Sequence, residues 1–169
     1  MSINKLENRQ DLEALFKWLN EPIYRYVYIR CGYNRELAED ITQDIFIKAW
    51  EKRLSFNPKK STLKNWLYTI TRNHIIDLYR KKKVDVKSFD EEIESGIKDE
   101  SMSIDDELLL TDILKSLDKL KDRDKELLIL RYIQDLDIEE ISKIVGKSYN
   151  TTKVMIHRAI KKLKYIINK

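Results

Sequence analysis

The sequence has little of what β-rich, disulfide-bonded or metal-binding folds require. Three glycines and two prolines among 169 residues are too few for the tight turns of an all-β fold. A single cysteine, Cys31, excludes an internal disulfide, and two histidines without a Cys-x-x-Cys pair leave no conventional zinc site. No apolar run approaches the roughly 20 residues that cross a bilayer, and the N-terminus has no signal-peptide core. We therefore expect an all-α, cytoplasmic protein without membrane insertion or metal.

No group of residues predicts catalysis or a cofactor. His74 and His157 lie far apart in the chain, and the carboxylates of Glu139 and Glu140 point in different helix directions. The segment 146–148 resembles the end of a phosphate-binding loop, but Ile141 stands where that motif has its first glycine. We expect neither an enzyme nor a bound cofactor.

The small net charge of +4 conceals a strong charge pattern. Residues 51–83 hold ten Lys/Arg and two acids, a local net of +8, and residues 84–107 hold ten acids and two lysines, a net of −8. Residues 143–169 hold eight basic residues and no acid. Two basic segments separated by an acidic one are typical of a protein that binds a polyanion. Solvated helix faces would also produce such charge runs, so charge alone does not distinguish a polyanion-binding surface from an ordinary solvated one.

Apolar residues at helical spacing predict four helices in the first half of the chain. The first covers Leu12 to Leu19, and Pro22 is expected to begin a second helix that stops near Gly32. The third covers residues 35–54. After a loop marked by Asn57-Pro58, the fourth runs from Leu63 into the basic run that ends at Lys83.

Residues 84–104 have no sustained period and are rich in acids and serine. Such composition favours a flexible linker, which would reach about 70 Å if fully extended. The sequence is thus divided into a domain of residues 1–83, an acidic linker of residues 84–104 and a domain of residues 105–169.

The second domain is predicted to contain four helices that end in a helix-turn-helix. A short helix with Ile138, Ile141 and Ile144 stops at Gly146, and a longer basic helix follows. If Ile156 and its apolar neighbours face inward, polar side chains occupy the opposite side: Asn150, Lys153, His157, Lys161 and Lys164. The start of this helix, residues 149–153, would then meet base edges in a major groove, and lysines 161, 162 and 164 would contact the backbone. A plain helical hairpin has the same pattern and remains an alternative.

Two further groups of residues have both a functional and an ordinary explanation. Residues 63–83 contain a mixture of aromatic and cationic side chains that suits single-stranded nucleic acid, although Trp66 could equally belong to the core. Asp40, Gln43 and Asp44 form a polar patch on an apolar helix, and that patch could be ordinary surface.

Three segments together resemble the bacterial RNA polymerase sigma factors of the extracytoplasmic-function (ECF) type. The first is Ala38-Glu-Asp-Ile-Thr-Gln-Asp-Ile-Phe-Ile-Lys-Ala-Trp50, the second is Trp66-Leu-Tyr-Thr-Ile-Thr-Arg-Asn73 with Asp77 and Arg80, and the third spans Leu117 to Leu163. The resemblance covers nearly the whole chain except its first ten or so residues and the linker. It implies that the first domain is sigma region 2 and the second sigma region 4.

The resemblance also implies the function, the partners and the residues that serve them. A sigma factor directs core RNA polymerase to promoters and promotes initiation, and family members are commonly restrained by an anti-sigma factor. The implied polymerase contacts are Asp40, Gln43 and Asp44. The implied contacts with the minus-ten element are Lys60, Trp66, Tyr68, Arg72, Asn73, Asp77 and Arg80. The implied contacts with the minus-thirty-five element are Lys147, Ser148, Tyr149, Asn150, Thr151, Lys153, His157 and Arg158.

Two other classes of protein remain open at this point. A free-standing helix-turn-helix repressor would bind duplex DNA without polymerase, and a single-strand or RNA-binding module would use the surface from Trp66 to Lys83. Thr152 and Met155 depart from the residues usual in the family, so the bases that the last helix reads also stay open.

Overall fold

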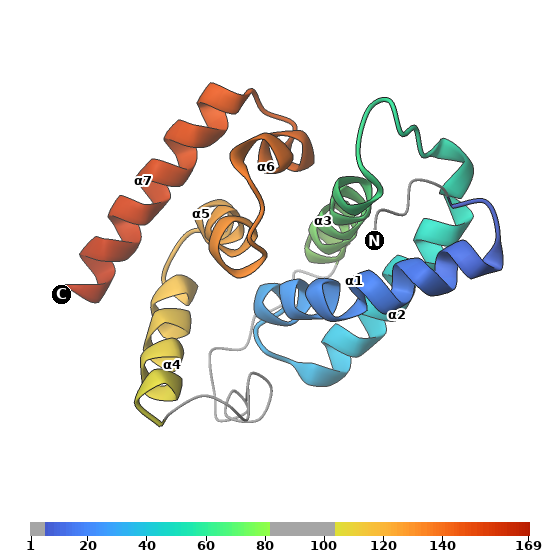
Figure 1. Cartoon of the computed structure of the whole chain (residues 1–169). Coiled ribbons are helices and arrows are strands. Elements are labelled where there is room, and N and C mark those ends of the chain that lie inside the picture. Colours follow the sequence, from blue (N-terminus) through green and yellow to red (C-terminus); the bar gives the residue numbers. More distant parts are fainter. Residues whose placement is uncertain (1–5, 82–103) are drawn as a thin grey trace.

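The computed structural model describes residues 6–81 and 104–169, and its regular structure in these ranges is helical (Figure 1). The expected all-α fold with two helical domains is confirmed. The first domain consists of α1 (Arg9–Arg30), α2 (Arg35–Glu51), the short η1 (Arg53–Ser55) and α3 (Leu63–Lys81). The second consists of α4 (Ile104–Asp118), α5 (Asp122–Leu128), the π-helical turn η3 (Ile129–Ile133), α6 (Ile138–Val145) and α7 (Tyr149–Ile167).

The prediction that Pro22 begins a second helix is wrong. Helix α1 is continuous from Arg9 to Arg30 and contains Pro22, and its start is fixed by a capping box between Asn8 and Asp11. A proline inside a helix removes one backbone hydrogen bond. Leu19 and Ile23 on either side of it are almost fully buried, so core packing holds the helix through this weak point.

The core of the first domain lies between α1, α2 and α3. Leu15, Ile23, Ile45 and Leu67 are completely inaccessible there. The turn that reverses the chain from α1 to α2 uses two residues in the left-handed region, Gly32 and Tyr33, with φ of 69° and 64°. A left-handed tyrosine is uncommon, and here its ring is buried against Tyr28, with the ring centroids 5.6 Å apart.

The four helices predicted for the second domain are present, and α4 begins at Ile104, the last residue of the predicted linker. The rest of that linker lies outside the described residues. Leu127, Leu130, Ile141 and Ile156 bury their side chains between α5, η3, α6 and α7. The predicted short helix, glycine turn and long basic helix correspond to α6, Gly146 and α7.

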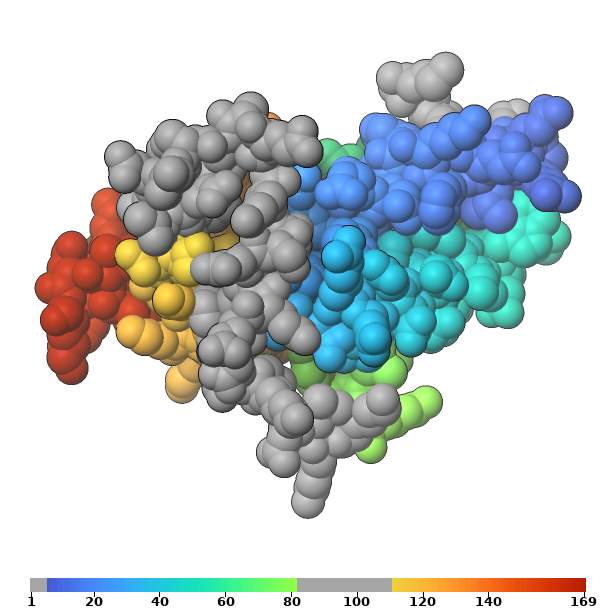
Figure 2. Space-filling view, turned by 90° about the horizontal axis from the view of Figure 1, so that it is seen from below, coloured from blue at the N-terminus to red at the C-terminus, as the bar shows by residue number. Residues whose placement is uncertain are grey.

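The two domains pack against each other in the described structure. Helix α3 lies beside α6, and α1 contacts η3 (Figure 1). Helix α7 forms the end of the molecule opposite α1 and α2, as the red and blue ends of Figure 2 show. The packing therefore places part of α3 at the boundary between the domains and leaves α7 on the outside.

Candidate nucleic-acid interface

The helix-turn-helix is shaped by local signals at both helix ends. Helix α6 ends at Gly146, whose φ of 65° and ψ of 41° lie in the left-handed region that glycine adopts without strain. Ser148 caps α7, since its hydroxyl accepts a hydrogen bond from the backbone N–H of Thr151 at 3.2 Å. The start of α7 is thereby set at a fixed angle to α6, as docking in a groove requires.

One face of α7 is buried and the other is open to solvent. Thr152, Ile156 and Ala159 are the buried positions, and Tyr149 is half exposed at 49%. Every side chain predicted here to contact DNA is exposed: Lys147, Ser148, Tyr149, Asn150, Thr151, Lys153, His157 and Arg158. This face contains cations, hydroxyls and an amide but no acid, so it can approach phosphates and donate to base edges.

The lysines farther along α7 are exposed as well, and one of them is already paired. Lys161, Lys162 and Lys164 face solvent, and the ammonium of Lys162 contacts the carboxylate of Asp124 on α5. That pair connects the C-terminal half of α7 to the start of α5. Lys161 and Lys164 extend the cationic surface beyond the turn.

The residues predicted on α3 divide into an outer and an inner set. Asn73, Asp77 and Arg80 are exposed. Tyr68 is 1% exposed, and its hydroxyl donates a hydrogen bond to Gln134 Oε1 of the second domain at 2.7 Å. Part of the predicted minus-ten surface is therefore covered by the second domain in this structure.

The loop before α3 has its own internal structure. Asn57 accepts a hydrogen bond from the N–H of Lys59 at 3.0 Å, and Thr62 accepts one from Asn65 N–H at 3.2 Å. Lys60 is exposed at the loop tip, and Trp66 packs on Phe56 with the ring centroids 5.4 Å apart. Trp66 is thus partly buried in its own domain and keeps part of its surface accessible.

A polar cleft of about 210 Å³ lies at the boundary between the domains. Arg72 contributes to it from α3, Arg123 and Glu126 from α5, and Lys147 from the turn before α7. Three cations and one carboxylate thus share a small space. The carboxylate of Glu126 is 3.1 Å from Nε of Arg72, which forms an ion pair between the two domains.

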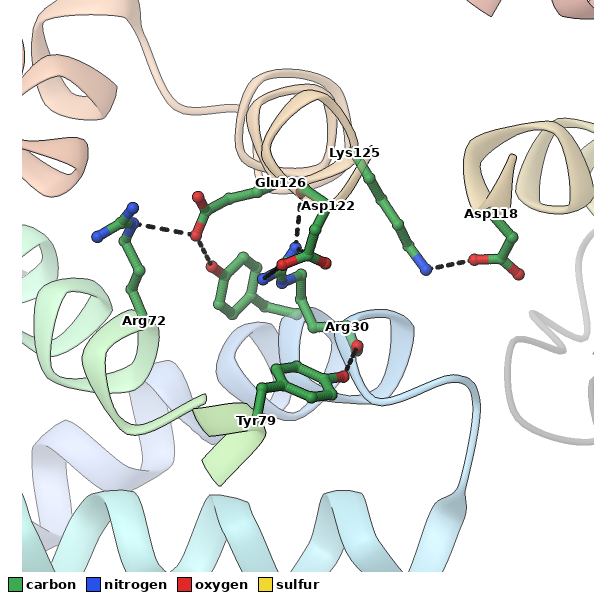
Figure 3. A network of polar contacts seen from close by, with 8 residues as sticks. Arg30, Arg72, Tyr79, Asp118, Asp122, Lys125 and Glu126 are labelled. Atoms are coloured by element: carbon green, nitrogen blue, oxygen red, sulfur yellow. Dashed lines mark hydrogen bonds and ion pairs between the residues drawn. The ribbon is translucent and has the colours of Figure 1, made fainter. Parts of the chain in front are cut away.

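A network of charged and polar side chains extends from this cleft along the boundary (Figure 3). Glu126 also accepts a hydrogen bond from the Tyr26 hydroxyl at 3.0 Å. Arg30 donates to both carboxylate oxygens of Asp122, at 2.9 and 3.0 Å, and to its backbone carbonyl at 2.9 Å. These contacts join α1 and α3 to α5.

The partners of these groups control their ionisation. Burial would lower the pKa of Arg30, but Tyr26, Glu126 and Asp122 outweigh it and hold the pKa above its ordinary value. Burial, followed by the neighbouring Glu126, raises the pKa of Tyr26 well above its ordinary value. Tyr26 is therefore a neutral donor and Arg30 a permanent cation.

A second surface lies on α2, away from the domain boundary. The predicted polymerase contacts Asp40, Gln43 and Asp44 are all exposed on one side of that helix. One turn farther, Ile47 is 57% exposed and borders an apolar groove of about 460 Å³. The groove is lined by Leu12, Phe16, Phe46, Ile47 and Trp50, with Arg9, Glu13 and Lys17 at its edge.

His74 connects α3 with the α2 surface. Its imidazole contacts the ammonium of Lys48, and its Nε2 lies 3.9 Å from the carboxylate of Asp44. Burial and then the charge of Lys48 lower the pKa of His74, while Asp44 and Asp77 act in the opposite direction. His74 is therefore a neutral packing residue near pH 7.

Cys31 caps the end of α1 beneath the domain boundary. Burial raises the pKa of its thiol to about 11, so the reactive thiolate is scarce.

Among residues 6–81 and 104–169, no group of His, Cys, Asp and Glu side chains is arranged to hold a metal ion. No helix within those ranges is long and apolar enough to cross a membrane.

Sequence reasoning missed the residues that join the domains. Arg30 and Glu126 are nearly inaccessible, at 4% and 3%, although both are charged. One signal was available for Arg30, because it follows Ile23, Tyr26 and Val27 at helical spacing on a buried face. No comparable signal connects Glu126 to a partner a hundred residues earlier.

Comparisons with known proteins give a consistent result. The family model for Sigma-70 region 2 matches residues 15–84, and that for Sigma-70, region 4 matches residues 110–163. The RNA polymerase sigma factor YlaC of Bacillus subtilis is 33% identical over 94% of this chain and 93% of its own length. The ECF RNA polymerase sigma factor SigW of the same species is 35% identical over 88% of this chain and 82% of its own.

Solved structures agree with these matches. The sigma factor RpoE of Bartonella quintana, solved in complex with the anti-sigma factor NepR, is 26% identical. Its TM-score is 0.75, and the alignment covers 94% of this chain and 98% of that one. CnrH, solved with the cytosolic domain of CnrY, shares the fold with a TM-score of 0.72 at 22% identity, over 95% of this chain and 90% of that one.

Proposed function

Because this chain belongs to the sigma-70 family of RNA polymerase sigma factors, in its extracytoplasmic-function group, we propose that its two helical domains divide promoter recognition between them. The chain is a sigma factor that directs core RNA polymerase to promoters for transcription initiation. Residues 1–83 act as region 2 and residues 105–169 as region 4. The acidic residues 84–104 connect them.

Region 4 binds the minus-thirty-five element through α7. The observation that carries this proposal is the open, acid-free face of α7 behind a glycine turn. Asn150 and His157 on the exposed face of the helix read base edges in the major groove, and Lys153 between them contacts the phosphate backbone. Lys147, Ser148, Tyr149, Thr151 and Arg158 flank them and position the helix on the phosphates.

Region 2 binds the minus-ten element through α3 and the loop before it. Lys60 in the loop and Arg80 at the end of α3 are exposed cations that suit a single strand. Asn73 and Asp77 are exposed polar groups between them. Trp66, Tyr68 and Arg72 complete the predicted surface, and the last two contact Gln134 and Glu126 of the second domain.

Core polymerase docks on the exposed side of α2. Asp40 and Asp44 offer two carboxylates to a cationic partner, and Gln43 between them can hydrogen-bond in either direction. The same side continues at Ile47 into the apolar groove. A partner helix with basic residues beside an apolar one would match this surface.

The chain acts without catalytic chemistry of its own, and it works in the cytoplasm, where core polymerase and promoters are found. Its relative from Bartonella quintana was solved with an anti-sigma factor. We propose a protein of that class as the regulator of this chain too.

Run-off transcription with purified core polymerase, with and without this chain, tests the proposal. We expect transcripts from cognate promoters only when the chain is present, and Asp44→Arg should abolish them. A footprint on duplex DNA without polymerase would instead favour a free-standing repressor. Binding to single strands with no effect on transcription would favour the single-strand module.

A further inference from the structure

The polar cleft at the domain boundary contains more positive than negative charge. It has a volume of about 210 Å³, and its charged lining residues are Arg72, Arg123, Lys147 and Glu126. Three cations and one carboxylate leave a formal surplus of two positive charges. A small cleft with such a surplus has the electrostatic character of an anion-binding site.

The acids on the adjoining helix α5 do not neutralise that surplus, because each of them already has a cation of its own. Asp122 accepts hydrogen bonds from Arg30, and Asp124 contacts the ammonium of Lys162. Glu126, the remaining acid of α5, is the carboxylate already counted in the cleft. In the part of the chain that the structure describes, the other two cations of the cleft therefore have no acidic partner.

The hydrogen-bond donors of the cleft are also incompletely used. Nε of Arg72 lies 3.1 Å from Glu126 but, among the described residues, makes no hydrogen bond, and the rest of the guanidinium points away from the carboxylate (Figure 3). Arg123 donates to Sδ of Met155 at 3.1 Å, and a thioether is a weak acceptor. A guanidinium presents a planar fork of N–H donors that matches phosphate oxygens. Both guanidiniums can therefore still bind an oxyanion.

The size and lining of the cleft indicate which anion fits. Pockets for drug-sized ligands begin at about 300 Å³, so a cleft of about 210 Å³ suits a smaller group. A phosphate monoester is compact, has several acceptor oxygens and carries a charge of about −1.5 to −2 at pH 7, which matches the surplus. Leu127, Val145 and Met155 form the apolar part of the lining and strengthen charge interactions by excluding water.

We propose that this cleft binds a phosphate group between the guanidiniums of Arg72 and Arg123 and the ammonium of Lys147. A phosphate group can belong to a free anion or to a nucleic-acid backbone. We assign a free phosphate, because a phosphodiester carries a single charge and leaves half of the surplus uncompensated. One consequence rests on the proposed function: the anion competes with promoter DNA for Arg72 and Lys147.

Isothermal titration calorimetry of the full chain with sodium phosphate tests the site, in a buffer free of phosphate at pH 7 and constant ionic strength. We expect saturable binding of one phosphate per chain. Arg123→Gln/Lys147→Gln should weaken binding by about tenfold or more, since it removes two charge-assisted contacts. The control, Arg9→Gln/Lys17→Gln, also removes one guanidinium and one ammonium, from exposed positions on α1, and should bind like the parent chain.

A second measurement distinguishes the two sources of phosphate. A short labelled oligothymidylate without terminal phosphates offers phosphodiesters alone, and fluorescence anisotropy gives its affinity for the same three proteins. We expect inorganic phosphate to weaken binding of this strand to the parent chain and to the control. If the cleft variant loses the strand while inorganic phosphate produces no heat with the parent chain, the cleft serves a nucleic-acid backbone and the assignment to a free phosphate is overturned.

Equal phosphate affinity in the cleft variant and the control would also overturn the proposal. Arg123 and Lys147 are both exposed, so the fold should persist, and circular dichroism checks it. Lys147→Gln alone is a milder variant and should shift the phosphate affinity in the same direction. Run-off transcription separates the two levels: a parent chain that is inactive with core polymerase contradicts the proposed function, whereas an active parent that binds no phosphate contradicts the phosphate site alone.

Discussion

The guanidinium of Arg30 donates three hydrogen bonds to a single residue, Asp122, which lies 92 positions later in the chain. Two go to the carboxylate and one to the backbone carbonyl. The arginine is buried at the end of α1, whereas the aspartate side chain is largely exposed at the start of α5. The two terminal nitrogens of a buried arginine in one domain are therefore paired with the backbone and the side chain of a single residue in the other domain.

This geometry predicts strong coupling between the two residues. Arg30→Met or Asp122→Leu alone should destabilise the packed form, because the first leaves the Asp122 carboxylate without its cation and the second leaves Arg30 with only the backbone carbonyl of residue 122. The double variant should recover most of that loss, since an apolar pair needs no compensation. A double-mutant cycle by urea denaturation should give an interaction energy of about 1–3 kcal/mol. If the two single substitutions change the free energy of unfolding additively, the predicted coupling is contradicted.

Lys153 provides a prediction for region 4. Lys153→Ala should weaken binding to a minus-thirty-five duplex and lower the slope of log affinity against log salt by about one unit, as loss of a phosphate contact does. Lys17→Ala, on an exposed position of α1, is the matched control and should leave the slope unchanged. The measurement is anisotropy of a labelled duplex over a salt series. Equal slopes for the two variants would exclude Lys153 from the backbone contacts.

Asp44 provides a prediction for polymerase docking. Asp44→Arg should abolish co-purification with core polymerase, because it turns an exposed carboxylate into a cation facing a basic partner. Stability should change by less than about 0.5 kcal/mol, as for most surface substitutions. Glu21→Arg reverses an exposed charge on α1 and should retain polymerase. If both variants co-purify with core polymerase, Asp44 on α2 does not belong to the docking surface.

His74 provides a prediction for pH dependence. In the unfolded chain a histidine has a pKa of about 6.5. In the folded protein the pKa of His74 is lower, because of burial and the charge of Lys48. Between the two values the unfolded chain binds more protons, so the free energy of unfolding falls as pH drops below about 6.5 and is unaffected by this group above it.

The corresponding variant should flatten that dependence. His74→Gln should lose less stability than the parent chain between pH 7.5 and pH 5, as measured by thermal unfolding. His157→Gln, on the exposed face of α7, is the control and should follow the parent chain. Parallel curves for all three proteins would show that His74 does not contribute.

Gly146 provides a prediction for the turn itself. A Cβ added there would meet no atom within 4 Å, so the effect of substitution comes from the left-handed backbone alone. Gly146→Ala should destabilise the protein by about 1 kcal/mol, and Gly146→Asn by less, since asparagine tolerates this conformation. Chemical denaturation measures both. Equal losses for the two variants would contradict the assignment of the effect to the left-handed backbone.

Much of the fold was predictable because its signals are local. Helix α2 and the α6–α7 unit follow from apolar spacing, from Gly146 and from the cap at Ser148. The break expected at Pro22 was wrong because burial of Leu19 and Ile23 outweighs the missing hydrogen bond. Propensity is a statement about an isolated helix, and tertiary packing overrides it here.

The functional surfaces were predictable only in part. The exposed positions on α7 follow from the same periodicity that defines its buried face. The covering of Tyr68 and Arg72 could not be foreseen, because it depends on Gln134 and Glu126, which periodicity does not connect to α3. Contacts between distant segments require knowledge of how the domains meet, and a single sequence does not contain it.

The raised pKa of Cys31 has a practical consequence for spectroscopy. With a value of about 11, roughly one thiol in a thousand is ionised at pH 8. An introduced surface cysteine would be alkylated far sooner, so fluorophores or spin labels can be attached at chosen positions while the native thiol is kept. Distances between such probes can then be measured in a protein that keeps Cys31 at the end of α1, next to Arg30.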